Sequence, residues 1–394
     1  TEPRNPLEFQ DGILSPLCLF QSSQFSILTR FIRHERHKSY KNVQMESATL
    51  SLLPSLKDSQ MPLPAQGIPS DRQPTSDGAL RSVPSSYGYT PHHRTSYHLQ
   101  SGVLHSPDAD GFDVAFHAKV VNEKNFKFEL GASMGHYKNE LTRLPQGQTS
   151  FETKMYNGTI LSKVGESAGV FYGYKTEGVY ATSEEAAAAG KYILDDSSNP
   201  VYFGAGDMKF VDKNNDGEIN ESDRFVIGDP NPDIYGNINM KFHFGQNWTL
   251  ATNFNYSLGN DIYNYQRSVL EGGSNFINQS KAMNRHWTTE GQVTDVPQVI
   301  YQDPMGNSRF SDRWIEDGSY LKLKNVTLSY RVPVRNEYLQ GITIWAAANN
   351  LFTLTEYLGT DPEVSCSNSV LNQGIDAGFL SSGRSFHLGV KINL

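Results

Sequence analysis

The stretch from Asp212 to Asp223 carries oxygen-bearing side chains at the spacing of a calcium-binding loop. Such side chains recur at alternate positions, and Gly217 permits the sharp turn that the loop needs. Calcium takes roughly six to eight oxygen ligands, which a loop of this length can supply. The predicted ligands of a structural Ca²⁺ are Asp212, Asn214, Asp216, Glu218 through its backbone carbonyl, and Asp223. The alternative interpretation is a tight Asn/Asp/Gly turn that holds no ion.

The segments around this loop alternate apolar and polar residues, whereas an EF-hand loop lies between two helices. Phe112–Val120 and Phe126–Met134 both have an apolar period of two, and the polar residues 122–125 between them predict a turn. These two segments therefore predict a hairpin of long antiparallel strands. The same period recurs at Ile238–Phe244, Trp248–Tyr256, Val326–Val332, Ile342–Ala348 and Phe386–Leu394. Within the loop itself, Ile219 is expected to pack inward.

The strand pattern favours a transmembrane β-barrel over a soluble β-sandwich. The expected strands have the length of membrane-spanning strands, about ten residues. Turns at one end are short, whereas the connections 145–233 and 266–317 at the other end are long. Aromatic residues stand where the interfacial girdles of such barrels lie, at Trp248, Tyr256, Tyr330 and Trp345. The fold class is therefore all-β, with part of an antiparallel transmembrane β-barrel preceded by an irregular N-terminal segment.

One short helix is expected inside the first long connection, at Ser183–Ala189. Ser183 is the expected N-cap, and the early glutamates suit the positive end of the helix dipole. Gly190 is expected to end the helix, because glycine readily adopts the left-handed conformation of a C-terminal cap.

The chain divides near residue 105 into two unlike parts. Residues 1–105 are rich in Ser, Pro and Gln and show no sustained strand or helix period, so we expect an irregular, low-order segment. Residues 106–394 carry the alternating strands. The net charge of −8 argues against nucleic acid as a partner. No apolar run reaches the ~18 residues that a transmembrane helix needs.

The sequence contains no arrangement typical of a catalytic centre. It lacks the motifs of a nucleophile elbow, a metalloprotease helix and a phosphate-binding loop. The acidic pairs Glu184–Glu185 and Glu316–Asp317 suit loop solvation better than a glycosidase dyad. We therefore expect a protein that is not an enzyme. Four loop aromatics could bind substrate by stacking on sugar rings or could simply pack the loops, namely Tyr263, Tyr265, Trp287 and Trp314.

The calcium-like loop lies inside Gly206–Asp233, the first of several long, ordered and specific stretches. The others are Phe171–Tyr180, Tyr256–Asn264, Ser311–Tyr330 and Asn349–Glu363. Together they closely resemble the SusC/RagA-type TonB-dependent outer-membrane transporters of Bacteroidetes. The resemblance covers about residues 110–394, which correspond to the C-terminal portion of the family's barrel.

The resemblance implies a large barrel in the outer membrane, plugged by an N-terminal domain, that imports oligosaccharides or peptides with energy passed on by TonB. It also implies a SusD-like surface lipoprotein as a partner and contact with outer-membrane lipid. The plug and the TonB-contacting region are not recognisable here, and the expected strands are too few to close such a barrel. We therefore expect a C-terminal barrel fragment. The alternative function is a secreted or surface β-protein whose calcium loop supports a binding module.

Overall fold

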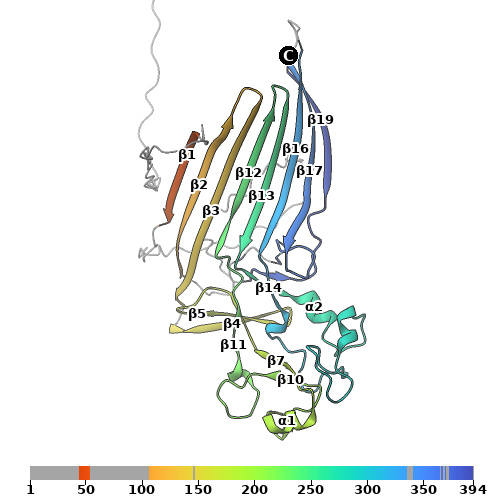
Figure 1. Cartoon of the computed structure of the whole chain (residues 1–394). Coiled ribbons are helices and arrows are strands. Elements are labelled where there is room, and N and C mark those ends of the chain that lie inside the picture. Colours follow the sequence, from red (N-terminus) through yellow and green to blue (C-terminus); the bar gives the residue numbers. More distant parts are fainter. Residues whose placement is uncertain are drawn as a thin grey trace, which may run out of the picture.

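The computed structural model shows an antiparallel sheet of eight strands with loops and small sheets gathered at one end (Figure 1). The residues that it describes are 44–53, 106–144, 147–334, 340–363, 365–366, 369 and 372–393. In spatial order the strands are β1 (Gln44–Leu53), β2 (Ser106–Asn122), β3 (Phe126–Arg143), β12 (Ile234–Phe244), β13 (Trp248–Leu258), β16 (Tyr320–Val332), β17 (Gly341–Thr355) and β19 (Ser385–Asn393). Each strand pairs antiparallel with its neighbours.

Alternate residues of the sheet separate an apolar face from a polar one. On one face, a row of directly opposed residues runs Phe128, Phe242, Leu250, Leu328, Ala346 and Leu388. The next row, on the other face, runs Glu129, Lys241, Ala251, Thr327, Ala347 and His387. A shift of one residue in any strand would mix the two rows, so the hydrophobic pattern fixes the register. The predicted alternation is confirmed.

The apolar face remains open to the surroundings in this chain. Its side chains on β19 are the clearest case, since Leu388 is 79% exposed. A broad apolar face with alternating polar residues behind it is the pattern of a strand sheet in contact with lipid. Among the described residues, no helix has the length and apolar character needed to cross a membrane.

The two ends of the sheet differ as the sequence predicts. Residues 123–125 join β2 to β3 and residues 245–247 join β12 to β13, both as short turns. Gly245 in the second turn has a φ of 62°, a conformation that glycine adopts without strain. At the opposite end, the chain between β3 and β12 and between β13 and β16 forms long connections (Figure 1).

The first long connection contains most of the small elements. They are β4 (Ser150–Met155), β5 (Gly158–Lys163), β6 (Val170–Gly173), β7 (Thr176–Val179), α1 (Ser183–Ala189), β8 (Tyr192–Leu194), β9 (Pro200–Tyr202), β10 (Met208–Phe210), the 3-10 turn η2 (Glu221–Asp223) and β11 (Phe225–Gly228). Strands β11, β6, β5 and β4 form a four-stranded sheet, while β10 pairs with β7 and β8 with β9.

The predicted helix is present, with one correction at its start. Thr182, not Ser183, is the N-cap, and its side-chain oxygen accepts a hydrogen bond from the amide of Glu185 at 3.2 Å. The Ser183 hydroxyl is instead directed to Glu290 at 3.1 Å. Gly190 ends the helix with a φ of 62°, as predicted.

The remaining connections contribute β14 (Asp261–Asn264), α2 (Tyr265–Leu270), the 3-10 turns η3 (Lys281–Arg285) and η4 (Asp312–Trp314), β15 (Ile315–Asp317) and β18 (Ile375–Asp376). The sequence did not predict α2, which is too short to show a helical period. Strand β18 lies parallel to β14, and β15 pairs with the other edge of β14. Residues 147–232, 259–319 and the described part of 356–384 are therefore interlocked, and we call them the loop module.

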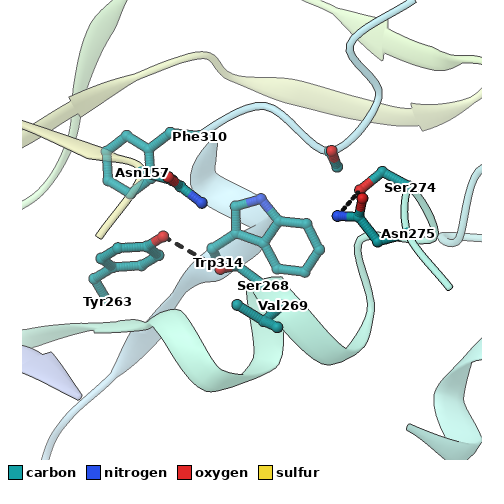
Figure 2. Close-up of a pocket in the computed structure, with 9 residues that line it drawn as sticks. Asn157, Tyr263, Ser268, Val269, Ser274, Asn275, Phe310 and Trp314 are labelled. Carbon is teal, nitrogen blue, oxygen red and sulfur yellow. Dashed lines mark hydrogen bonds between the residues drawn. The ribbon is translucent and has the colours of Figure 1, made fainter. Parts of the chain in front are cut away.

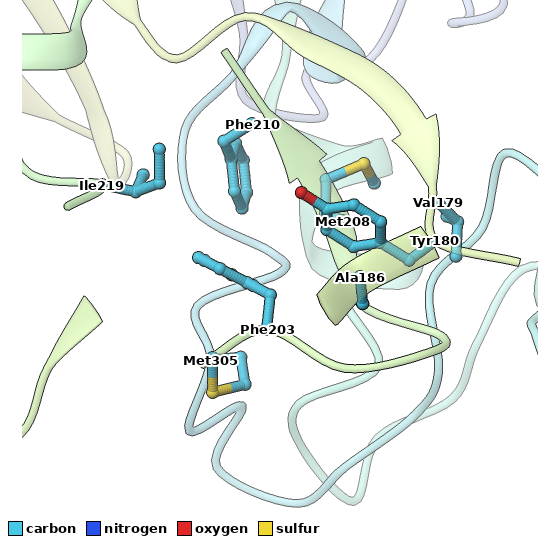
Figure 3. Packing of buried hydrophobic residues seen from close by; sticks show 8 residues of the cluster. All are labelled: Val179, Tyr180, Ala186, Phe203, Met208, Phe210, Ile219 and Met305. Atoms are coloured by element: carbon cyan, nitrogen blue, oxygen red, sulfur yellow. The ribbon is translucent and has the colours of Figure 1, made fainter. Parts of the chain in front are cut away.

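The loop module has two hydrophobic clusters of its own. The first, in Figure 3, contains Val179, Tyr180, Ala186, Phe203, Met208, Phe210, Ile219 and Met305. Ile219 is nearly fully buried there, so the expectation that it packs inward is confirmed. The second cluster contains Ile160, Phe171, Tyr263, Trp314 and Ile375. Three separate connections supply the second cluster, which explains why the long loops form one body.

Strand β1 lies inside residues 1–105, for which the sequence predicts no regular element. It pairs antiparallel with β2, from Gln44 opposite Lys119 to Leu53 opposite Gly111. The other residues of that N-terminal part lie outside the described residues. The boundary between the two predicted parts stays a prediction.

Candidate functional site

The calcium-like loop is folded by hydrogen bonds from its own backbone. The Asp212 carboxylate accepts hydrogen bonds from the amides of Asn215 at 2.7 Å and Gly217 at 2.8 Å. Asp216 accepts one from the amide of Glu218 at 2.8 Å. Asn215 has a φ of 59° and Gly217 a φ of 82°, so the chain turns sharply twice. Asparagine and glycine are the residues that adopt this conformation most readily.

Asp223 closes the loop from inside the protein. Its side chain is fully buried, and its two carboxylate oxygens accept hydrogen bonds from the amides of Lys213 and Asn220, each at 2.9 Å. The Asn220 side chain in turn accepts a hydrogen bond from the amide of Ser222 at 2.8 Å, at the start of η2. The Asp223 carboxylate therefore links the two ends of the loop by hydrogen bonds.

The donor set only partly suits calcium. Asp212, Asn214 and Asp216 follow one another around the turn, and their oxygens keep lone pairs beyond the hydrogen bonds they accept. Both oxygens of Asp223, however, are directed to backbone amides. Within the described ranges, no three His, Cys, Asp or Glu side chains gather closely enough to hold a metal ion. The calcium site at Asp212, Asn214, Asp216, Glu218 and Asp223 stays a prediction.

A polar pocket of about 100 Å³ opens in another part of the loop module (Figure 2). The turn between β4 and β5, strand β14, helix α2, the loop that follows α2, and the segment that enters η4 all contribute side chains. The lining residues are Asn157, Tyr263, Ser268, Val269, Ser274, Asn275, Ser308, Phe310 and Trp314. None of these is a carboxylate, a lysine, an arginine or a histidine, so the pocket offers neutral hydrogen-bonding groups.

Tyr263 links three of the elements that surround the pocket, namely β14, the β4–β5 turn and α2. Its hydroxyl donates to the carbonyl of Tyr156 at 2.7 Å and lies 3.2 Å from the Ser268 hydroxyl. Tyr156 and Asn157 both have a positive φ and form the hairpin turn between β4 and β5. Burial raises the pKa of Tyr263 to about 12, while the Ser268 hydrogen bond lowers it. The phenol therefore remains a neutral donor near neutral pH.

Trp314 is another large aromatic side chain that lines the pocket. Its indole nitrogen donates to the carbonyl of Arg309 at 3.1 Å. The guanidinium of Arg313 lies 4.4 Å from the Trp314 ring centre, and that of Arg267 lies 5.9 Å away. Burial lowers the pKa of Arg313 to about 10, which still leaves the group charged at neutral pH. Two cations against one ring hold the indole in place.

The structure gathers three of the four predicted substrate-binding aromatics and places the fourth elsewhere. Tyr263 and Trp314 belong to the second cluster, where Tyr263 is only 1% exposed and Trp314 is fully buried. The Tyr265 ring lies 6.3 Å from that of Tyr263. Trp287 packs on the first cluster, and its indole nitrogen donates to the carbonyl of Ala181 at 3.3 Å. Their role in substrate binding stays a prediction, and their burial shows that they also pack the loops.

Sequence reasoning missed the aromatic residues that face solvent beside this pocket. Phe276 is 89% exposed and Tyr301 is 56% exposed, and their rings stack at 4.6 Å with an angle of 25°. The available signal was the pair Phe276 and Ile277 in an otherwise polar run of glycine, serine, asparagine and glutamine, where no apolar period explains a phenylalanine. We call Phe276 and Tyr301 the aromatic pair.

No protein-family model matches the chain. TonB-dependent receptor P3 of Formosa agariphila is 30% identical over 295 residues, which cover 72% of this chain and 28% of the receptor. TonB-dependent receptor SusC of Bacteroides thetaiotaomicron is 23% identical over 72% of this chain and 26% of its own length. The chain is related to the SusC/RagA-type TonB-dependent receptors.

Solved structures agree with this relationship at the level of the fold. The RagAB peptide importer in its closed-closed state superposes with a TM-score of 0.56 and 20% identity, over 73% of this chain and 30% of that one. The SusC/RagA-type fold assigned from the sequence is therefore confirmed, as part of an outer-membrane β-barrel. The outer membrane is the location of these receptors, as the sequence predicts. The chain spans under a third of the length of the relatives that it matches.

Proposed function

We propose that the chain forms the C-terminal barrel portion of an outer-membrane, TonB-dependent transporter for oligosaccharides or peptides. The segregation of the sheet into an apolar and a polar face carries the proposal. It gives one surface for lipid and one for a water-filled interior, with every long connection at a single end. The relatives are receptors, which supports transport rather than catalysis as the role.

The polar face has the chemistry of a lumen wall. Asn239, Asn253, Asn325 and Asn349 stand directly opposite one another across four strands. Asn325 donates to Asn349 at 2.7 Å, so part of this row is a connected ladder of carboxamides. Amides at an interior wall can bind a passing polar solute or a plugging domain without the cost of a buried, unpaired charge.

The loop end is the proposed docking side for a SusD-like surface lipoprotein. One relative is the TonB-dependent receptor SusC, and the solved neighbour is the RagAB peptide importer. TonB would act through an N-terminal region that is not recognisable in this sequence. We also propose that a calcium ion binds the outward-facing loop from Asp212 to Asp223 and stabilises it, and that the ion is not a transported substrate.

The orientation can be tested by labelling single cysteines in intact cells, in a background that carries Cys18→Ser and Cys366→Ser. Tyr202→Cys places a thiol on an exposed loop residue, and Lys124→Cys places one in the turn at the opposite end. A membrane-impermeant maleimide should label position 202 in intact cells and position 124 only after the outer membrane is permeabilised. Recovery of the protein in the soluble fraction, or equal labelling of both positions in intact cells, would refute the proposal.

Transport itself is tested by deleting the gene and measuring growth on single carbon sources. Loss of growth on one oligosaccharide or peptide, restored by the intact gene, is the expected result. Unchanged growth and unchanged uptake of every labelled oligosaccharide and peptide tried would overturn the transport role. The fold would still stand in that case.

A further inference from the structure

A segment that follows β17 is anchored at both of its ends. Residues 356–363 and 365–366, which we call the strap, lead from the end of β17 toward β18. The hydroxyl of Tyr357 donates to the buried carboxylate of Asp376 at 2.7 Å. The amide of Cys366 donates to the carbonyl of Ile375 at 2.9 Å. The middle of the strap therefore spans two fixed points.

Two lysines of β16 reach from the sheet to the middle of the strap. Lys322 pairs with Asn255 on β13, so it lies on the polar face, one polar row from the ladder of carboxamides. Lys324 is the extra residue of a β-bulge, at the break in register between β13 and β16. A bulge re-aims the side chain that it inserts, and here both ammonium groups reach the same carboxylate.

The carboxylate of Glu363 in the strap is the point where three donors of β16 meet. The ammonium groups of Lys322 and Lys324 each lie 2.6 Å from its Oε2, and the hydroxyl of Tyr320 donates to its Oε1 at 3.2 Å. Asp361 adds a second carboxylate, whose Oδ2 lies 2.7 Å from the Lys322 ammonium. The side chains of Lys322 and Asp361 are only 3% and 5% exposed. Charged donors that converge on one carboxylate make the short, strong hydrogen bonds of an anion site.

We propose that Tyr320, Lys322 and Lys324 form a binding site for a solute carboxylate, and that the strap fills this site with its own carboxylates in this structure. We call these three residues the wall site. The inference rests on the proposed function, which makes the polar face the wall of a lumen. It adds an anionic group to the chemistry of the solute. The strap is then an autoinhibitory contact, which an anionic solute displaces.

Charge balance explains why the wall site would take an anion once the strap has moved. Two lysines face two carboxylates, so the closed arrangement is neutral. If the strap lifts, both ammonium groups lose their counter-charge, and Lys322 lies on a buried part of the wall, where an unpaired charge is costly. A solute carboxylate restores the balance and accepts the same hydrogen bonds, whereas a neutral solute restores no charge.

The middle of the strap docks mainly through these charges. No residue from Leu358 to Glu363 belongs to either hydrophobic cluster, and Leu358 is 72% exposed. Lifting this part therefore leaves both clusters intact, while Tyr357 and Cys366 hold the two ends. The exchange of one carboxylate for another is thus a local movement of the strap and not an unfolding of the loop module.

Binding is measured on the purified, detergent-solubilised protein as the rise in melting temperature with sodium succinate, against sodium chloride at the same ionic strength. Asp361→Asn combined with Glu363→Gln empties the wall site, and this emptied variant should respond to succinate. Wild type should need about tenfold more succinate for the same rise, because its own carboxylates compete at the high effective concentration of a tethered group.

Lys322→Met in the emptied variant should abolish the response, since the ammonium that contacts both strap carboxylates is gone. Lys391→Met is the matched control, because Lys391 is also a lysine of the polar face but lies near the turn end of β19, opposite Thr343. It should leave the response of the emptied variant unchanged. No response in the emptied variant, or a response that survives Lys322→Met, would overturn the wall site and leave a purely structural ion cluster.

Displacement of the strap is measured with Pro362→Cys, in a background that carries Cys18→Ser and Cys366→Ser. Residue 362 is buried and stands between the two strap carboxylates in the chain, both of which this reporter keeps. The reporter therefore decides the matter even if the emptied variant does not fold. Succinate should speed the reaction of the thiol with a maleimide, and sodium chloride should not. Equal rates in the two salts would overturn the exchange, whereas binding at the wall site without uptake of any solute in cells would refute transport alone.

Discussion

The sheet and the loop module hold their residues in place by different means. In the sheet, position follows from a period of two, and strands such as β12 and β13 pair without interruption over their full length. In the loop module, position follows from individual polar side chains, each hydrogen-bonded to a group elsewhere in the chain. Asp223, Tyr263 and Asp207 each join segments that no period relates. The sheet should therefore tolerate many substitutions on either face, and the loop module few at these positions.

The largest expected effect is at Asp223. Asp223→Ala leaves the part-buried amides of Lys213 and Asn220 without an acceptor, at about 1–3 kcal/mol each. We expect the loop to become sensitive to limited proteolysis between residues 212 and 224. Asp195→Ala is the control, since its carboxylate also accepts from two backbone amides but is exposed. Equal protection of wild type and the Asp223 variant from proteolysis would show that the loop does not depend on the hydrogen bonds of the Asp223 carboxylate.

Substitutions in the sheet should lower stability for a different reason, because they change its contact with lipid. Val326→Arg puts a charge on the apolar face near the middle of β16, which costs about 2–4 kcal/mol in a bilayer. Thr327→Arg, one residue on, faces the polar side and should cost much less. The folded fraction in lipid vesicles, read from heat-modifiable migration on gels, compares the two. If both variants fold equally well, the assignment of faces is wrong.

A smaller effect is expected at Asp261 in β14. Burial raises the pKa of Asp261, nearby acidic residues raise it further, and the hydrogen bond from the Asp229 amide lowers it. Because the folded pKa lies above the ordinary value of 3.8, Asp261 stabilises the fold below that pH, and the stabilisation is lost as the pH rises through the folded pKa. Asp261→Asn should thus melt higher than wild type at neutral pH and alike in acid. A constant difference across pH would contradict this.

The smallest expected effect is that of calcium. Since the loop is already folded by hydrogen bonds, calcium should raise the melting temperature of wild type by a modest amount, and a chelator should reverse it. Asp212→Asn combined with Asp216→Asn should abolish the response and leave the sheet intact. If neither calcium nor the chelator changes the melting temperature, the loop is the turn that holds no ion.

The comparison also explains what could be predicted from the sequence. Seven of the eight strands of the main sheet follow from alternation, so their order of appearance and faces could be derived from residues such as Phe242 and Lys241, whereas β1 lies where no such period was recognised. Helix α1 could be predicted from Gly190 and its early glutamates, although its cap is one residue earlier. The pocket could not be predicted, because Asn157 and Ser308 come from segments that carry no period, and only tertiary contacts bring them together. The exposure of Phe276 depends in the same way on where its neighbours fold.

The parallel pairing of β14 with β18 has a consequence for how the molecule folds. Tyr263 pairs with Ile375, so the second hydrophobic cluster joins residues that are far apart in the chain, with strands β16 and β17 between them. Hairpins such as β12–β13 involve only near neighbours, and contacts of short sequence separation form fastest. The segment from Asp212 to Asp223 is also largely local, since most of its hydrogen bonds join residues within the segment, although Gly217 and Ile219 also form backbone hydrogen bonds with Tyr192. We expect hairpins and this small loop to appear early in refolding, and the loop module, with its pocket, to assemble last.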